Sequence, residues 1–80
     1  MSIERQMQAI STLQEGHVYD LDFRMSLKTR TLEVTNLLQI DTYDIESLYK
    51  LGFIVSIYTN IGTFDTDNYG FQLHILDTKS

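Results

Sequence analysis

The first fifteen residues carry the apolar spacing of an amphipathic helix. Apolar side chains recur at intervals of four, three and three residues, which places them in one stripe of a helix with about 3.6 residues per turn. Ser2 stands where an N-cap accepts a hydrogen bond from the first turn, and Gly16 is a natural helix end. We therefore predict a helix over residues 3–14 whose core-facing stripe is Ile3, Met7, Ile10 and Leu13.

The next segment alternates between apolar and polar positions with a period of two. Apolar side chains occupy every second position over residues 19–27, and Asp20, Asp22 and Arg24 lie between them. Such alternation is typical of a strand with one buried face. A second, less regular run over residues 31–40 predicts the partner strand, which we expect to end near Asn36 or Leu38, where the alternation decays.

A turn at residues 29–30 would align the apolar faces of these two strands. Leu27 would then oppose Leu32, and Met25 would oppose Val34. A shift of one residue would turn one strand over and lose this agreement. Neither turn residue favours a tight two-residue turn, so a slightly longer loop of the same parity is the alternative.

A second helix is predicted to begin at Asp41 or Thr42 and to end before Gly52. Its acidic residues lie in the first turns and Lys50 lies in the last turn, which is the arrangement that the helix dipole favours. The side chains that share its apolar face are Ile45, Leu48 and Tyr49.

Two further strands complete the predicted fold. Residues 53–59 are rich in strand formers, residues 60–70 contain the Gly, Asp and Asn of a loop, and residues 71–75 alternate again. The order α-β-β-α-β-β belongs to the α+β class and is a circular permutation of the ferredoxin-like pattern. It predicts a four-stranded sheet with the fourth and second strands in the centre and two helices on one face. The inward sheet residues are then Leu21, Phe23, Met25, Leu32, Val34, Val55, Ile57, Phe71, Leu73 and Ile75.

The composition is globular and bounds the chemistry of the chain. Its 80 residues have room for a single domain, residues 1–80, and the absence of cysteine excludes disulfides and zinc–thiolate sites. Eleven acidic side chains oppose six basic ones, for a net charge of −5, which argues against direct nucleic-acid binding. The sequence shows neither an apolar stretch of membrane-spanning length nor an apolar signal core, so we expect a cytoplasmic protein with no membrane partner.

Two features suggest a metal site, and each lacks part of the required ligand set. Residues 65–70 resemble the start of an EF-hand calcium loop, but Tyr69 and Leu76 occupy positions where that loop needs oxygen ligands. His17 and His74 are the two imidazoles, and they do not form the close pair that a zinc site uses. We expect neither a metal nor a cofactor.

Asp20 and Asp22 form a pair of carboxylates of the kind that performs acid–base chemistry. Two residues apart on a strand, they point the same way and lie about 7 Å apart. Catalysis needs a pocket around such a pair, and an exposed strand face is a poor one. The sequence also lacks a Gly-rich phosphate loop and a recognisable Ser-His-Asp grouping, so we expect a protein that is not an enzyme.

The sheet face away from the helices is the strongest candidate for binding. RNA-binding sheets carry aromatic residues on their central strands, where this chain has His74, Leu76, Glu33 and Thr35. A mixed polar and apolar face suits a protein partner or a second copy of the chain better. The candidate protein-binding residues are Asp20, Asp22, Arg24, Ile54, Tyr58 and His74.

These observations leave three functional hypotheses open. The first is a small acidic protein-binding module, such as a phage or mobile-element inhibitor of a nucleic-acid-handling host protein, because the charge of −5 complements a basic partner. The second is a small-molecule-binding regulatory module that acts as a dimer. The third is a minor structural or assembly protein. We also expect a homodimer, because a chain of 80 residues buries little apolar surface alone.

Overall fold

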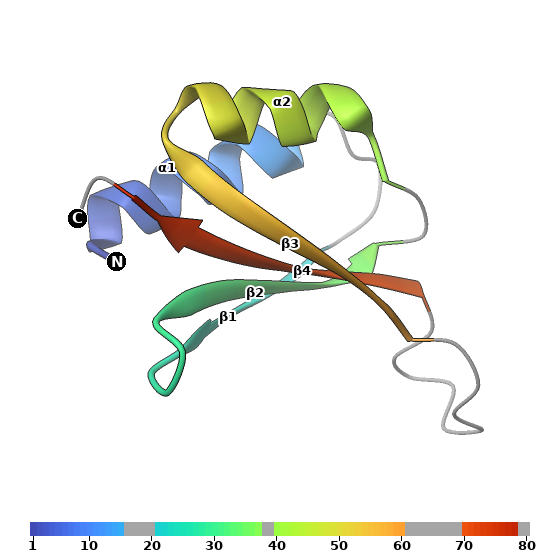
Figure 1. Cartoon of the computed structure of the whole chain (residues 1–80), viewed down its shortest axis with the longest axis horizontal. Coiled ribbons are helices and arrows are strands. Elements are labelled where there is room, and N and C mark those ends of the chain that lie inside the picture. Colours follow the sequence, from blue (N-terminus) through green and yellow to red (C-terminus); the bar gives the residue numbers. More distant parts are fainter. Residues whose placement is uncertain (16–20, 38–39, 61–69, 79–80) are drawn as a thin grey trace.

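The structure is a four-stranded antiparallel sheet with two helices on one side (Figure 1). This computed structural model describes residues 1–15, 21–37, 40–60 and 70–78. The elements are α1 (Ile3–Gln14), β1 (Asp22–Ser26), β2 (Thr31–Leu37), α2 (Thr42–Lys50), β3 (Phe53–Asn60) and β4 (Gly70–Asp77). The strand order is β1-β2-β4-β3, so the predicted class, element order and sheet arrangement are confirmed. Within these ranges, neither helix has the length and apolar character needed to cross a membrane.

Both helices begin at the caps that the sequence predicts. The side-chain oxygen of Ser2 accepts a hydrogen bond from the backbone N–H of Arg5, and Asp41 caps α2 in a similar way. Gly52 follows α2 with a φ of 93°, a left-handed conformation that glycine adopts without steric cost. The predicted end of α1 at Gly16 lies outside the described residues.

Helix α1 is rotated relative to the prediction, so that only Ile10 and Leu13 of the predicted stripe pack in the core. Its buried residues are Ala9 and Leu13, whereas Ile3 and Met7 of the predicted stripe are 77% and 62% exposed. Arg5, Ala9 and Leu13 follow one another at intervals of four residues and so share one side of the helix. The rotation is explained by Arg5, which is held against the sheet by a buried ion pair described below.

The β1–β2 hairpin has a different register from the predicted one. Phe23 pairs with Val34, and Met25 pairs with Leu32. This pairing is shifted by two residues from the prediction. The strands are joined by a four-residue turn over residues 27–30, which is the longer loop of the same parity named above as the alternative to a two-residue turn.

The longer turn accounts for the shift. Arg30, the last residue of this turn, adopts a left-handed φ of 57°. Leu27, which was expected to face Leu32, lies in this turn and is 89% exposed. Because the shift is even, the apolar residues of both strands stay on the predicted face.

A β-bulge in β2 resets the alternation of its apolar residues. Val34 pairs with Leu73, whereas Leu37 pairs with Phe71, and the register shifts between these two pairs. Strict alternation from Val34 would have continued at position 36. The extra residue of the bulge instead turns Leu37 inward, where it is 2% exposed.

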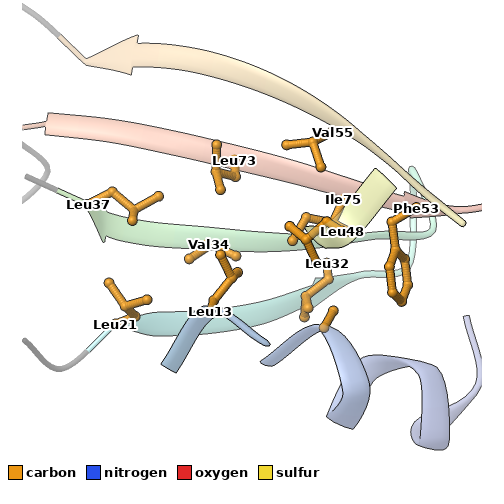
Figure 2. Packing of buried hydrophobic residues seen from close by; sticks show 11 residues of the cluster. Leu13, Leu21, Leu32, Val34, Leu37, Leu48, Phe53, Val55, Leu73 and Ile75 are labelled. Atoms are coloured by element: carbon orange, nitrogen blue, oxygen red, sulfur yellow. The ribbon is translucent and has the colours of Figure 1, made fainter. Parts of the chain in front are cut away.

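The core lies between the helices and the inner face of the sheet. Figure 2 shows Leu13 of α1 and Leu48 of α2 pointing toward the strands. Ile57 was predicted to be buried but is 47% exposed. It follows Val55 on the same face, and β3 runs out past α2 at its far end (Figure 1). The buried hydrophobic residues are Ala9, Leu13, Leu21, Leu32, Val34, Leu37, Leu48, Phe53, Val55, Leu73 and Ile75, and Phe23, Met25 and Phe71 pack partly buried against them.

Arg5 joins four elements through a single guanidinium group. Its Nε donates to Oδ2 of Asp77 at 3.1 Å, and its Nη2 donates to Oδ1 at 3.2 Å. Nη2 also donates to the carbonyl oxygen of Leu51, and the guanidinium lies 4.2 Å from the centroid of the Phe53 ring. The side chains of Arg5 and Asp77 are 20% and 1% exposed. This group therefore ties α1 to the end of α2, the start of β3 and the end of β4.

Replacing Asp77 with Asn should lower the free energy of unfolding by about 3 kcal/mol, because the substitution leaves a mostly buried guanidinium without its counter-charge. Urea unfolding measures the loss. The double variant Arg5→Met/Asp77→Leu removes both charges and should recover most of the loss. A change below about 0.5 kcal/mol for Asp77→Asn would show that the ion pair does not hold α1 on the sheet.

Candidate functional site

The side of the sheet away from the helices is open in the part of the chain that the structure describes, and we call it the outer face. Its side chains alternate with the buried ones along each strand. Both helices lie on the other side of the sheet (Figure 1). The outer face is formed by Asp22, Arg24 and Ser26 of β1, Thr31, Glu33 and Thr35 of β2, Ile54, Ser56 and Tyr58 of β3, and Gln72, His74 and Leu76 of β4.

The β1–β2 half of the outer face is polar. Arg24 pairs with Glu33 across the strands, and its Nε lies 3.5 Å from Oε2 of Glu33. The predicted register placed Arg24 opposite Thr35, so the observed shift is what brings this ion pair together. The Arg24 side chain is 79% exposed and that of Glu33 is 16% exposed. The guanidinium is therefore accessible to a partner, while the carboxylate is held within the sheet surface.

The β3–β4 half of the outer face carries all of its large apolar side chains. Ile54 and Leu76 are direct cross-strand neighbours and are 49% and 41% exposed. Tyr58 is 50% exposed, and the centroid of its ring lies 4.5 Å from that of His74. His74 in turn pairs with Glu33 of β2, so the polar and apolar halves meet in the middle of the sheet.

The predicted binding residues that the structure describes all lie on the outer face, but they form two groups. One group is on the edge strand β1 and the other is on the opposite edge strand β3, with β4 contributing a residue between them. Asp20 lies outside the described residues, as do His17 and most of the predicted loop. The predicted residues found on the face are Asp22, Arg24, Ile54, Tyr58 and His74.

Glu33 and Leu76 complete this surface, although neither was among the predicted binding residues. The signal for both was present in the alternation of their strands. Glu33 forms an ion pair with Arg24 on this surface, and that pairing depends on the length of the β1–β2 turn. Leu76 lies beside Ile54 and extends the apolar surface there, and this position depends on the β3–β4 register.

A separate groove of about 490 Å³ lies on the helix side, between the end of α1 and α2. Its lining includes Glu15, Asp41, Glu46 and Lys50. Acidic side chains outnumber the basic one, so the groove carries negative charge. Across the described ranges, however, no group of three His, Cys, Asp or Glu side chains is placed to hold a metal ion.

The fold and the outer face define a small α+β protein with one covered and one open sheet face. Comparison with protein-family models, with curated proteins and with solved structures finds no match to this chain. Its function therefore has to be inferred from the surface itself.

Replacing Arg24 with Gln should change the free energy of unfolding by less than about 1 kcal/mol, because the guanidinium that pairs with Glu33 is largely exposed. Added salt should reduce even this difference by screening. Urea unfolding at low and high salt measures both effects, with Lys28→Gln in the β1–β2 turn as the control. A loss of 3 kcal/mol or more, on the order expected for a buried pair, would mean that Arg24 is not accessible on the outer face.

Proposed function

We propose that this chain is a non-catalytic protein-binding module whose docking surface is the outer face. The observation that carries the proposal is the presence on this one face of Ile54, Tyr58 and Leu76, which are 49%, 50% and 41% exposed. Each Å² of apolar surface that a partner removes from water lowers the free energy by about 25 cal/mol. A group of such side chains on a sheet face that neither helix covers is therefore favoured when a partner covers it.

The proposed partner is a protein with a basic surface. The chain has a net charge of −5, and the exposed residue Asp22 lies on the same face of the sheet as these apolar side chains. Opposite charges speed encounter and set the orientation of a complex. In this arrangement the side chains of β3 and β4 supply the apolar centre of the contact and those of β1 and β2 supply its polar rim.

The finer form of the proposal is that the protein occupies the basic surface of a nucleic-acid-handling protein and so inhibits it. This form is supported by the acidic charge of the chain. It predicts that the partner loses nucleic-acid binding when the complex forms, because both ligands would compete for the same basic side chains.

Replacing Leu76 with Lys should weaken capture of the partner at least about tenfold, since a charge would be buried at the centre of the contact. The experiment uses the immobilised chain and a lysate of host cells, at low salt and at high salt. Leu27→Lys is the matched control, because it makes the same substitution in the exposed β1–β2 turn. Circular dichroism checks that both variants are folded.

We expect the wild-type chain and Leu27→Lys to retain the same protein at low salt and to release it at high salt. Leu76→Lys should retain little of that protein at low salt. Equal retention by the two variants would contradict the outer face as the docking surface. Failure of the wild-type chain to retain any protein at low salt would contradict the proposed function.

A further inference from the structure

The edge strand β3 is long, regular and without charge. It pairs with β4 along all eight of its residues with no register shift, and its sequence FIVSIYTN contains no Asp, Glu, Lys, Arg or Pro. Natural edge strands are usually protected from pairing by charges, proline or bulges. The other edge strand, β1, carries Asp22 and Arg24. The edge of β3 therefore lacks the protection that β1 has.

The hydrogen bonds of β4 show which backbone groups of β3 point to this edge. The N–H of Thr78 donates to the carbonyl oxygen of Gly52 at 3.1 Å, which makes them a hydrogen-bonded pair at the start of the β3–β4 ladder. Hydrogen-bonded and non-bonded pairs alternate in an antiparallel ladder. The even-numbered residues of β3 therefore bond to β4, and Val55, Ile57 and Thr59 direct their N–H and C=O groups outward.

A side-chain contact supports this assignment. The hydroxyl of Tyr49 on α2 donates to the carbonyl oxygen of Val55 at 3.4 Å, so that oxygen points away from β4. Tyr49 itself is 51% exposed. A carbonyl oxygen has two lone pairs, so Val55 can accept a further hydrogen bond without losing Tyr49.

We propose that β3 pairs with β3 of a second copy of this chain, in antiparallel orientation about a twofold axis at Ser56. This register is compatible with the outward-pointing groups, because Val55 and Ile57 of one copy form hydrogen-bonded pairs with Ile57 and Val55 of the other. On the outer face it places Ile54 of each copy opposite Tyr58 of the other. An aromatic side chain opposite a β-branched one is a favourable cross-strand pair.

This register places the half-exposed apolar side chains of β3 against apolar side chains of the second copy. Moving the twofold axis by one residue does not. Ile54, Ile57 and Tyr58 are 49%, 47% and 50% exposed, and each faces an apolar side chain of the second copy. Moving the axis to Ile57 would place Tyr58 opposite Ser56 and Ile54 opposite Asn60. The pairing also brings together the uncharged edges of two chains that each carry a net charge of −5, which limits their repulsion.

The proposed contact is smaller than a standard protein interface, so a weak dimer is expected, with a Kd of roughly 1–100 µM. It does not rest on the proposed function of the outer face. The two copies would form one continuous sheet whose outer faces both stay open, so partner binding and self-association can be tested separately.

Analytical ultracentrifugation over a range of concentrations tests the proposal. The wild-type mass should rise from 9.3 kDa toward twice that value as the concentration passes through the Kd. Ser56→Lys places two like charges against each other at the axis and should raise the Kd at least about tenfold. Ser11→Lys, the same substitution at an exposed position of α1, and Leu76→Lys on the outer face should each change it less than about threefold.

Cross-linking and amide exchange give a second readout that does not depend on Ser56→Lys being folded. The chain has no cysteine, so Ser56→Cys introduces a single thiol at the axis. Opposed residues of a non-hydrogen-bonded pair have Cα atoms about 4.5 Å apart, within the range of a disulfide. Mild oxidation should link Ser56→Cys much faster than Ser11→Cys. At high concentration the amides of Val55, Ile57 and Thr59 should become protected from exchange.

Each outcome decides for or against the proposal. Self-association that Ser56→Lys weakens, with fast cross-linking of Ser56→Cys, supports it. A wild-type mass of 9.3 kDa at concentrations up to about 1 mM overturns it. A dimer that Ser56→Lys leaves intact, or that Leu76→Lys abolishes, also overturns it, because a different surface would then be in use.

Discussion

Two helices of 12 and nine residues have enough surface to cover one face of a four-stranded sheet. Four strands span about 19 Å at the usual spacing, and two helices side by side cover about 20 Å. Both helices are therefore used on the same side, where Leu13 and Leu48 complete the core. In the part of the chain that the structure describes, the opposite face is therefore left uncovered, and the proposed function depends on that division.

The small core also explains why a buried ion pair, Arg5–Asp77, joins α1 to β4. Ala9 and Leu13 are the fully buried residues of α1, which is little apolar contact for a helix of three turns. Arg5 adds a bidentate bond to Asp77 and a contact with the Phe53 ring. As a consequence, the side of α1 that carries Ile3 and Met7 faces solvent, although the spacing of these apolar residues is typical of a buried stripe.

The element order and the bounds of both helices follow from periodicity and capping, because these signals are local. The strand order follows from the likeness of that element order to a permuted ferredoxin-like pattern. The hairpin register does not, since it depends on a turn closed by Arg30 in a left-handed conformation, which few residue types favour. Asp77 was recognisable in principle, because it continues the inward phase of Leu73 and Ile75 along β4. Its partner was not, because Arg5 lies 72 residues away in the sequence. Most of the outer face was predictable, since a shift by two residues preserves which side chains share a face.

The central claim is that one sheet face is closed and the other is open, and methyl NMR with a soluble paramagnetic chelate tests it most directly. The chelate broadens resonances that it can approach from solvent. We expect strong broadening for Ile54 and Leu76 on the outer face and little change for Leu32 and Ile75 in the core. If the methyl groups of Ile54 and Leu76 were as well protected as those of Ile75, another part of the chain would cover the outer face, and the division on which the proposed function rests would be contradicted.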